Sequence, residues 1–254
     1  MAFATIHYFS RSIRKASSFN IIFPEDPAVP RPWAAFYLLH GLSDDNTIWA
    51  RRTSIERYVE GWPLVVVMPD GGRGWYTNAV EGDAYEDDLL KDVIGLVDRT
   101  FPVKAERTGR AIGGLSMGGY GAVKLGLKHP EVFASVHSHS GALGFLAESV
   151  KKYKEFSPEF ARIFGKSPAG GPEDPFAISE RTDHGRIPKL RFDCGTEDFL
   201  LTQNRAFHQH LDSLHIPHEY QEFPGGHDWA YWDKHVQEAI AFHARNLQLK
   251  HVGG

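Results

Sequence analysis

Residues 113–119, Gly-Gly-Leu-Ser-Met-Gly-Gly, are the most informative stretch of this sequence. A short apolar run precedes it at residues 110–114, and a helical pattern of apolar residues follows it as far as His129. A serine with a glycine two residues before it and two residues after it, between a strand and a helix, is typical of a tight, strained turn that exposes the hydroxyl. Because Gly-x-Ser-x-Gly alone also occurs by chance in loops, it is this context that predicts a nucleophilic Ser116.

On both sides of this turn, short apolar runs alternate with helical stretches. Continuous apolar runs suit strands buried on both faces of a parallel sheet, and we expect them at residues 34–39, 64–68, 110–114, 133–136 and 190–194. Helices are expected at residues 83–101, 118–129, 199–214 and 228–247. The alternation predicts an α/β fold, with a mostly parallel central sheet and helices on both faces. Two opening strands, residues 5–10 and 18–23, are expected to pair antiparallel at one edge.

One long segment, about residues 144–188, does not fit the alternation, so we expect a single domain over residues 1–254 that carries an insertion. The insertion is either a surface excursion or a small cap over the site. Its apolar residues recur at helical spacing and are expected to pack the insertion onto the body: Phe156, Phe160, Ile163 and Phe164. Charged residues interrupt it and argue against a long apolar groove: Lys151, Lys152, Lys154, Glu155, Lys166, Glu173, Asp174, Arg181 and Asp183.

The amino-acid composition limits the kinds of molecule that this chain is expected to bind. The chain has 254 residues, 42% of them hydrophobic, and a formal net charge of −4, so we expect neither nucleic-acid nor membrane binding. The first ten residues lack the basic and apolar regions of a signal peptide, which favours a cytoplasmic protein, although a mature secreted form would look the same. Cys194 is the single cysteine, and it is expected to be a small buried hydrophobe rather than a catalytic thiol. The oligomeric state is left open, with a homo-oligomer possible.

A nucleophilic serine needs a base, and in this type of fold the chain order is serine, acid, histidine. His227 follows the last expected strand and precedes the last helix, which places it at the carboxyl edge of the sheet. His137 and His139 come too early if the acid follows the next strand. The remaining candidates fall in or beside a helix and are expected to be solvated or packed: His208, His210, His215 and His218.

The acid is expected between Ser116 and His227. Asp198 comes just after the strand at residues 190–194, and Glu197 is its closest rival, one residue away. Asp193 lies inside that strand, and Asp228 is expected to cap the last helix. Position therefore favours Asp198.

The developing oxyanion needs two fixed donors. One is expected to be the amide of Met117, the residue after the nucleophile, and the other the amide of Leu42, in the loop after an earlier central strand. Gly41 allows that loop to turn inward. His40 lies beside the substrate in this arrangement, where it more simply braces the loop than takes part in catalysis.

Several motifs together resemble the esterase D family of α/β-hydrolases, which includes S-formylglutathione hydrolases, mycolyltransferases and bacterial acyl esterases. The similarity is greatest to its tributyrin-esterase branch and runs over nearly the whole chain. The motifs are His40-Gly-Leu42, residues 114–121, Ser140-Gly-Ala-Leu143, Cys194-Gly-Thr-Glu-Asp-Phe-Leu200, Gly225-Gly-His-Asp-Trp229, Gly74-Trp-Tyr-Thr-Asn78 and Trp229-Ala-Tyr-Trp232. The resemblance implies the α/β-hydrolase fold, and it implies Asp198 rather than Glu197 as the acid.

The expected activity is hydrolysis of short-chain acyl esters by a Ser116–His227–Asp198 triad, with no cofactor and no metal. Trp75 and Trp229 neighbour the loops of the site and are expected to line the substrate pocket, although such aromatic residues often belong to the core. A thioesterase of the S-formylglutathione hydrolase type or an acyltransferase would use the same groups. A non-catalytic binding protein on the same scaffold is less expected, because all three triad positions are filled.

Overall fold

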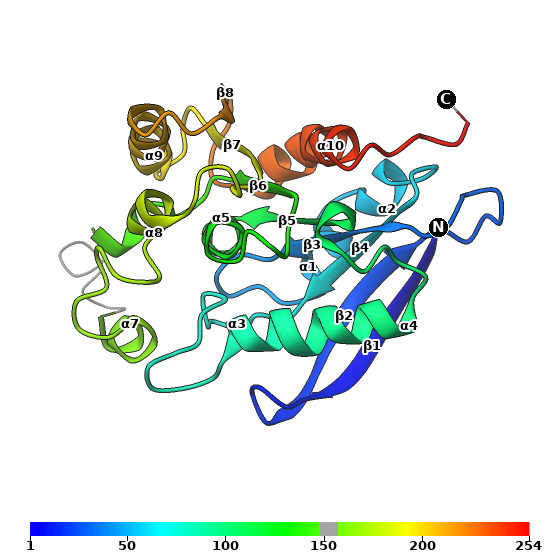
Figure 1. Cartoon of the computed structure of the whole chain (residues 1–254), viewed down its shortest axis with the longest axis horizontal. Coiled ribbons are helices and arrows are strands. Elements are labelled where there is room, and N and C mark those ends of the chain that lie inside the picture. The colour runs from blue at the N-terminus through cyan, green and yellow to red at the C-terminus, as the bar shows by residue number, and fades with distance from the viewer. Residues whose placement is uncertain (148–156, 254) are drawn as a thin grey trace.

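In the computed structural model, eight strands form one sheet across residues 1–147 and 157–253, the part of the chain that the structure describes (Figure 1). The strand order is β1-β2-β4-β3-β5-β6-β7-β8. The strands are β1 (Ala2–Ser10), β2 (Lys15–Phe23), β3 (Ala34–Leu39), β4 (Leu64–Pro69), β5 (Arg110–Leu115), β6 (Ser135–His139), β7 (Lys189–Gly195) and β8 (His218–Phe223). All pairs from β4 to β8 are parallel, whereas β1 pairs antiparallel with β2, and β2 with β4. The sheet is therefore mostly parallel, with the expected antiparallel edge.

The sequence analysis did not predict β8, and it placed β6 too early. β8 is an edge strand whose residues alternate between half-buried and exposed positions, so it lacks the continuous apolar run used to find the inner strands. β6 is fully buried, yet two of its five residues are histidines and two are serines. Neither strand has the apolar run expected of a buried strand, because both contain polar side chains that tertiary contacts hold in place.

Helices cover both faces of the sheet (Figure 1). One face carries α1, α2 and α10 around a core that includes Phe36, and the other carries the remaining helices around a core that includes Tyr37. Neighbouring residues of β3 thus point to opposite cores, as strand geometry requires. The helices are α1 (Ile48–Arg52), α2 (Ile55–Tyr58), α3 (Tyr85–Asp87), α4 (Ile94–Thr100), α5 (Met117–Lys128), α7 (Ser157–Phe164), α8 (Pro175–Arg181), α9 (Leu201–Ser213) and α10 (Trp229–Asn246), with a 3₁₀ turn at Arg107–Gly109.

The helix expected at residues 83–101 is divided by a π-helical turn, Asp88–Val93, between α3 and α4. The turn aims two carboxylates at the first hairpin. Tyr8 donates to Asp88 at 3.0 Å, and the Ser10 hydroxyl donates to Asp92 at 3.0 Å. These contacts join the helix to β1, and they explain a change of helical pitch that apolar spacing cannot reveal.

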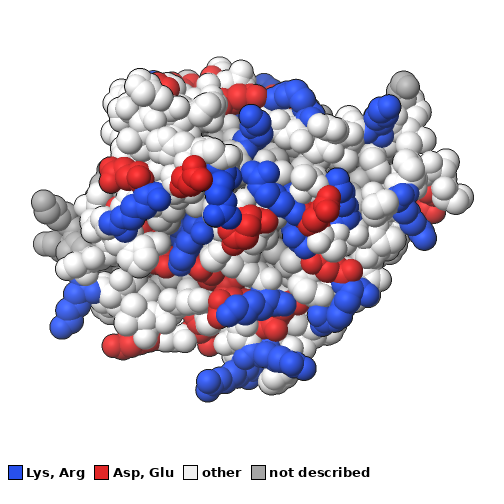
Figure 2. Space-filling model, in the orientation of Figure 1, with Lys and Arg blue, Asp and Glu red and all other residues white. Residues whose placement is uncertain are grey.

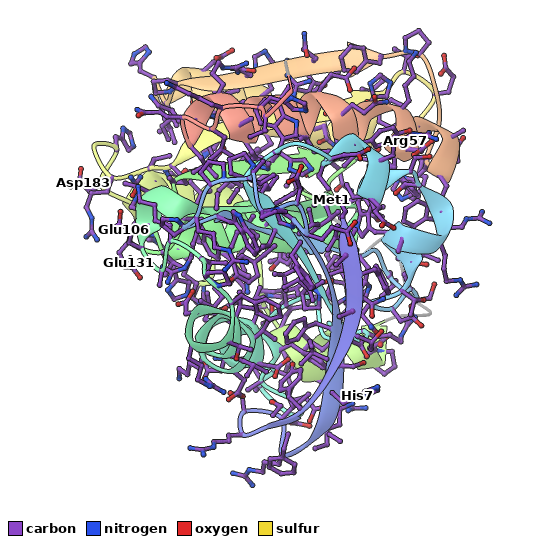
Figure 3. All side chains as sticks on the ribbon, turned by 90° about the vertical axis from the view of Figure 1, so that its right-hand side faces the viewer. Met1, His7, Arg57, Glu106, Glu131 and Asp183 are labelled. Carbon is purple, nitrogen blue, oxygen red and sulfur yellow. The ribbon has the colours of Figure 1, made fainter. Side chains whose placement is uncertain are left out.

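β1 forms the outer edge of the sheet, with Met1 and His7 near its two ends (Figure 3). Its outward residues include Phe3 and Phe9, which are exposed. On the face drawn in Figure 2, basic and acidic side chains are interspersed. Among the described residues, no helix is both long and apolar enough to span a bilayer.

The described part of the insertion packs on the body through aromatic contacts. Phe160, Ile163 and Phe164 are buried, as the helical spacing predicts. The Phe160 ring lies edge-on to Phe145, with 4.5 Å between ring centroids. The remaining residues named for this segment at positions 151–156 lie outside the described residues.

Glu173 joins the insertion to the body through a buried ionic cluster. Lys124, on α5, has no exposed side-chain surface and contacts Glu86 at 2.7 Å and Glu173 at 3.0 Å. Lys128 contacts the same two carboxylates. Burial raises the pKa of Glu86, but its contacts with His129 and the two lysines outweigh this, and the pKa lies well below its ordinary value. Glu173 therefore fixes the insertion to α5.

Candidate active site

Ser116 lies between β5 and α5 in a strained conformation, with φ 52° and ψ −115°. A non-glycine residue at positive φ is costly and marks a site that its surroundings hold in place. Gly114 and Gly118 make this turn possible. A β-carbon on either would lie 2.6 Å or less from the Leu39 carbonyl oxygen, so a side chain has no room there. The turn thus has the geometry that the glycine spacing predicts.

The backbone of the β6 end clamps this turn on both sides. The Ser116 amide donates to the His139 carbonyl at 3.0 Å, and the Ala142 amide donates to the Ser116 carbonyl at 3.2 Å. Between these contacts lies Ser140, itself at φ 48°, whose amide donates to the Asp193 carbonyl at 2.8 Å. Ser116 and Ser140, which directly follow the neighbouring strands β5 and β6, are thus both at positive φ and both held by backbone hydrogen bonds. Sequence reasoning found the Ser140 segment only as a family motif.

His227 connects Ser116 to a carboxylate. Its Nε2 lies 3.1 Å from Ser116 Oγ, and its Nδ1 lies 2.8 Å from Asp198 Oδ2. The Asp198 side chain is fully buried, and its other oxygen accepts from the Leu200 amide at 2.8 Å. The arrangement fixes the imidazole with its proton on Nδ1, which leaves Nε2 free to accept the serine proton.

The two rival carboxylates have different surroundings. Burial raises the pKa of Asp198, but the hydrogen bond and charge of His227 outweigh it, so the pKa lies below its ordinary value. Glu197 instead points to solvent and accepts from the Thr196 hydroxyl and the Gly225 amide. Of the two, only Asp198 contacts His227. Asp193 is buried against His139 and Tyr231, and Asp228 caps α10, both as expected.

Two backbone amides near Ser116 have no protein acceptor among the described residues: those of Leu42 and Met117. The Leu42 loop is close to the nucleophile, because a β-carbon on Gly41 would lie 3.8 Å from Ser116 Cβ. His40 is buried beneath it, with Nδ1 donating to the Gly41 carbonyl at 2.8 Å and Nε2 accepting from the Gly71 amide at 2.9 Å. His40 thus braces the loop, as expected.

Aromatic side chains surround the imidazole of His227. Phe199 lies 4.5 Å from it between ring centroids and is 62% exposed, and Trp232 lies edge-on at 4.9 Å. Trp229 packs edge-on against Trp49 and Trp232, and its expected contact with substrate stays a prediction. Sequence reasoning did not single out Phe199, although an aromatic residue directly after the acid in the same loop was the available signal.

Trp75 is buried under the insertion. Its ring stacks on Phe145 at 4.3 Å and meets Tyr120 edge-on at 5.5 Å. Tyr120 is one helical turn after Ser116, and its amide donates to the Ser116 carbonyl. Trp75 therefore joins the insertion to α5 as a core residue, and its expected place in the substrate pocket stays a prediction.

A second histidine cluster lies under α10 and away from the surface. His243 contacts the Ser135 hydroxyl through Nδ1 at 2.7 Å and His137 through Nε2 at 2.9 Å. Burial lowers the pKa of His243 to about 3 and the pKa of His137 well below its ordinary value.

Burial also raises the pKa of the Cys194 thiol, which makes that cysteine a poor nucleophile, as expected.

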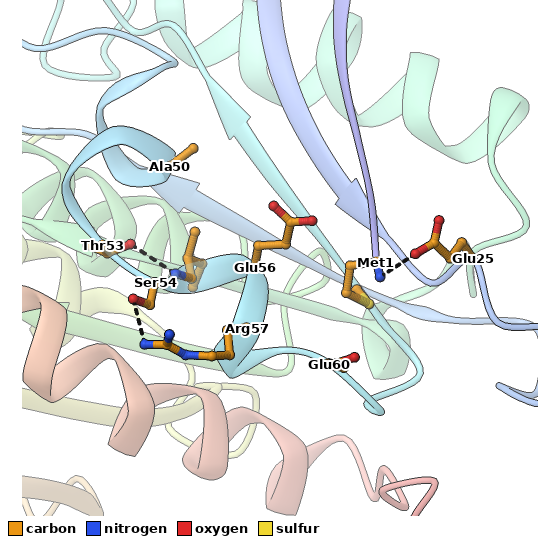
Figure 4. Close-up of a pocket in the computed structure, with 9 residues that line it drawn as sticks. Met1, Glu25, Ala50, Thr53, Ser54, Glu56, Arg57 and Glu60 are labelled. Atoms are coloured by element: carbon orange, nitrogen blue, oxygen red, sulfur yellow. Dashed lines mark hydrogen bonds and ion pairs between the residues drawn. The ribbon is translucent and has the colours of Figure 1, made fainter.

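One sizeable cavity, of about 500 Å³, lies on another part of the surface (Figure 4). Thr53 and Ser54 provide its hydroxyls, and no histidine lines it. Arg57 donates to Ser54 at 2.8 Å, and the amino terminus pairs with Glu25 at 2.9 Å. Without a base next to a hydroxyl, this cavity lacks the chemistry that the Ser116 region has.

Comparisons with known proteins show which family this chain belongs to. The model of the Esterase family, described as "Putative esterase", matches residues 10–243. An acetyl esterase from Caldicellulosiruptor saccharolyticus is 30% identical, over 94% of this chain and 97% of that protein.

Two solved structures from Staphylococcus aureus share the fold. The fluorophosphonate-binding serine hydrolase FphF has a TM-score of 0.87, and the S-formylglutathione hydrolase FrmB has a TM-score of 0.83. Each is 33% identical, over 95% of this chain and 98% of its own. The fold is the α/β-hydrolase fold, as predicted. The chain belongs to the Esterase family, is similar to the esterase D type within it, and is a carboxylic ester hydrolase of the serine class.

Proposed function

We propose that this chain hydrolyses short-chain acyl esters with Ser116 as the nucleophile, His227 as the base and Asp198 as the acid that orients His227. The observation that carries the proposal is the unbroken line of contacts from Asp198 through His227 to Ser116, at 2.8 and 3.1 Å. Both distances are within hydrogen-bond reach, which a general base requires. The relative named as an acetyl esterase supports a small acyl group.

The reaction follows from these contacts. His227 Nε2 takes the hydroxyl proton as Ser116 Oγ attacks the ester carbonyl carbon, and the carbonyl electron pair moves to its oxygen. The amides of Leu42 and Met117 are proposed to bind that oxyanion. Collapse expels the alcohol, which takes its proton from His227. Water then attacks the acyl-enzyme with His227 as base, which releases the acid and restores Ser116.

The proposed preference for short acyl chains rests on the aromatic residues between α5 and the insertion. Trp75, Phe145 and Phe160 are all buried and in contact, so they fill the space that a long acyl chain would need. Each methylene that enters an apolar pocket gains about 0.8 kcal/mol, so the chain-length profile reports pocket depth.

A series of p-nitrophenyl esters tests this preference. We expect acetyl to butyryl esters to have the highest kcat/KM, with a steep fall beyond. Phe160→Ala should move the optimum to longer chains, whereas the matched control Phe207→Ala, in a separate aromatic group on α9, should not. A kcat/KM that rises through decanoyl in the parent protein would contradict a short pocket.

A thioesterase is the second candidate, because the S-formylglutathione hydrolase FrmB is one of the similar structures. The same three groups would serve a thioester. A direct comparison of kcat/KM for S-formylglutathione and p-nitrophenyl acetate separates the two, and acetylated sugars extend the panel to natural esters. A large preference for the thioester would replace the ester assignment while leaving the roles of Ser116, Asp198 and His227 intact.

A further inference from the structure

Three side chains suited to binding a metal ion lie together between α9 and β8. His208 and Asp212 are on the same side of α9, one helical turn apart, and His218 is the first residue of β8. One ligand atom from each lies within 4.8 Å of the other two. Within residues 1–147 and 157–253, this is the one group of three such residues.

The distances are close to those of a zinc site. His218 Nε2 is hydrogen-bonded to His208 Nδ1 at 2.7 Å and lies 3.9 Å from Asp212 Oδ1, while His208 faces Asp212 Oδ2 with its other nitrogen, Nε2, at 3.5 Å. With bonds of 2.0–2.1 Å, tetrahedral zinc holds its ligand atoms about 3.3 Å apart. The imidazoles therefore need to separate, and the carboxylate to approach, by about 0.6 Å each. Movements of this size are within the reach of side-chain torsions.

The His218 ring is already held in a metal-binding orientation, whereas His208 has to release its Nδ1 proton when a metal ion binds. His218 Nδ1 donates to the Ile216 carbonyl at 2.8 Å, so the lone pair is on Nε2, which faces the other two residues. Such a bond from the second ring nitrogen is usual for a metal-binding histidine. The His218 ring stacks on Phe192, and the His208 ring stacks on Tyr220.

Access to the group is open from one side. The side chain of His218 is 3% exposed, whereas those of His208 and Asp212 are 34% and 60% exposed. A metal ion can therefore enter from solvent, and a water molecule can complete a tetrahedral shell. Two imidazoles and one carboxylate favour zinc over magnesium or calcium, which prefer oxygen ligands.

We propose that His208, Asp212 and His218 bind one zinc ion that ties α9 to β8. α9 begins at Leu201, soon after Asp198, and β8 ends at Phe223, shortly before His227. His218 is at the opposite end of β8 from His227, so the ion takes no part in ester hydrolysis. Its role is to stabilise the two elements that follow the acid and precede the base.

Calorimetric titration of the chelator-treated, dialysed full chain with zinc chloride tests the site. We expect one zinc ion per chain and no binding of magnesium or calcium at the same concentrations. His208→Gln and Asp212→Asn should each weaken zinc binding tenfold or more. His215→Gln is the matched control, since His215 is exposed in the turn between α9 and β8, and it should bind zinc as the parent does.

Thermal unfolding gives the second measurement. At a free zinc concentration 100 times the Kd, Tm should rise by about 5–10 °C in the parent and in His215→Gln, while kcat/KM stays the same. Stoichiometric binding that survives both His208→Gln and Asp212→Asn would overturn the proposal. So would the absence of zinc binding by the parent, or its loss in His215→Gln.

Discussion

Ser116–His227 and Ser135–His243 are both serine–histidine pairs, and only the first has the surroundings of a catalytic site. His227 contacts Ser116 at 3.1 Å and a carboxylate on its other side, and its side chain is 18% exposed. His243 contacts Ser135 at a shorter 2.7 Å, but its other partner is His137, and the pair is fully buried. Proximity of a serine to a histidine is thus not sufficient. A base needs a carboxylate to stabilise its charged form and a surface that substrate can reach.

The electrostatics of the two pairs follow from this difference. Asp198 can stabilise a positive charge on His227, whereas burial, together with the charges of His139 and Arg191, lowers the pKa of His243 to about 3. Ser135–His243 is accordingly a neutral hydrogen bond that joins β6 to α10. This hydrogen bond contributes to stability, but the low pKa of His243 prevents it from accepting a proton from a nucleophile.

Exchanging each serine for alanine should separate the pairs most strongly. Ser116→Ala should lower kcat for p-nitrophenyl acetate by about 10⁴- to 10⁶-fold without loss of fold, because only binding and the oxyanion amides remain. Ser135→Ala should leave kcat within severalfold and lower Tm, because a buried imidazole loses its partner. If a fluorophosphonate probe labels Ser116→Ala as well as the parent, Ser116 is not the nucleophile.

Removing the carboxylate should make His227 resemble His243. Asp198→Asn should lower kcat by about 10⁴-fold, because the wrong tautomer of His227 then faces Ser116. Glu197→Gln, one residue away, should change kcat by only a few fold, since Glu197 contacts Thr196 and Gly225 instead. The reverse ranking of these two variants in single-turnover acylation would move the acid to Glu197.

The buried pair should be visible in the pH dependence of stability. Because the pKa of His243 is lower in the folded state than the ordinary 6.5, the unfolded state binds the extra proton first, and stability falls as pH drops below 6.5. Between pH 7.5 and pH 5, His243 alone should cost about 2 kcal/mol of unfolding free energy. Urea unfolding at the two pH values measures this loss.

His243→Gln is the control, because it removes the titrating group from the same position. Its unfolding free energy should vary less between the two pH values, by about the same 2 kcal/mol. An unchanged pH dependence in this variant would mean that His243 is charged, or solvated, in the folded protein.

The smallest expected effect is that of a chelator on the reaction. Three side chains and two amides suffice for the proposed mechanism, and the proposed zinc site is at the far end of β8. Dialysis against EDTA should therefore leave kcat/KM within about twofold of the untreated enzyme, even where it lowers Tm. Loss of activity that a divalent ion restores would contradict the mechanism.

The sequence predicts the Ser116 pair well because its determinants are local. The glycines around Ser116 specify the turn, and the strand ends carry Asp198 and His227 to one edge of the sheet, where the three side chains are found together. The Ser135–His243 pair could not be predicted in this way. Its members are 108 residues apart and meet only through the packing of α10 on β6, which no short pattern encodes.

The same reasoning explains the other differences. β8 was missed because one side of an edge strand is solvated, so β8 lacks the continuous apolar run of the inner strands. The π-helical turn follows from hydrogen bonds of Asp88 and Asp92 to a hairpin some 80 residues earlier, which helical periodicity does not contain. The contacts of Glu173 with Lys124 and Lys128 could not be predicted either, because Glu173 is 49 and 45 positions away from them in the chain and the three residues form no short pattern.

The contacts of Glu173 with Lys124 and Lys128 have a consequence for redesign of substrate range. They fix the point at which the insertion returns to α5, the helix that begins directly after Ser116. A library confined to residues 158–172 would therefore vary the insertion while its contacts with α5 through Glu173 are kept. If a library also varies Glu173, a change in substrate selectivity can no longer be separated from a shift of α5, the helix that follows Ser116. The ion pairs of Glu173 thus mark the boundary between the residues that such a library can vary and the residues that it should keep.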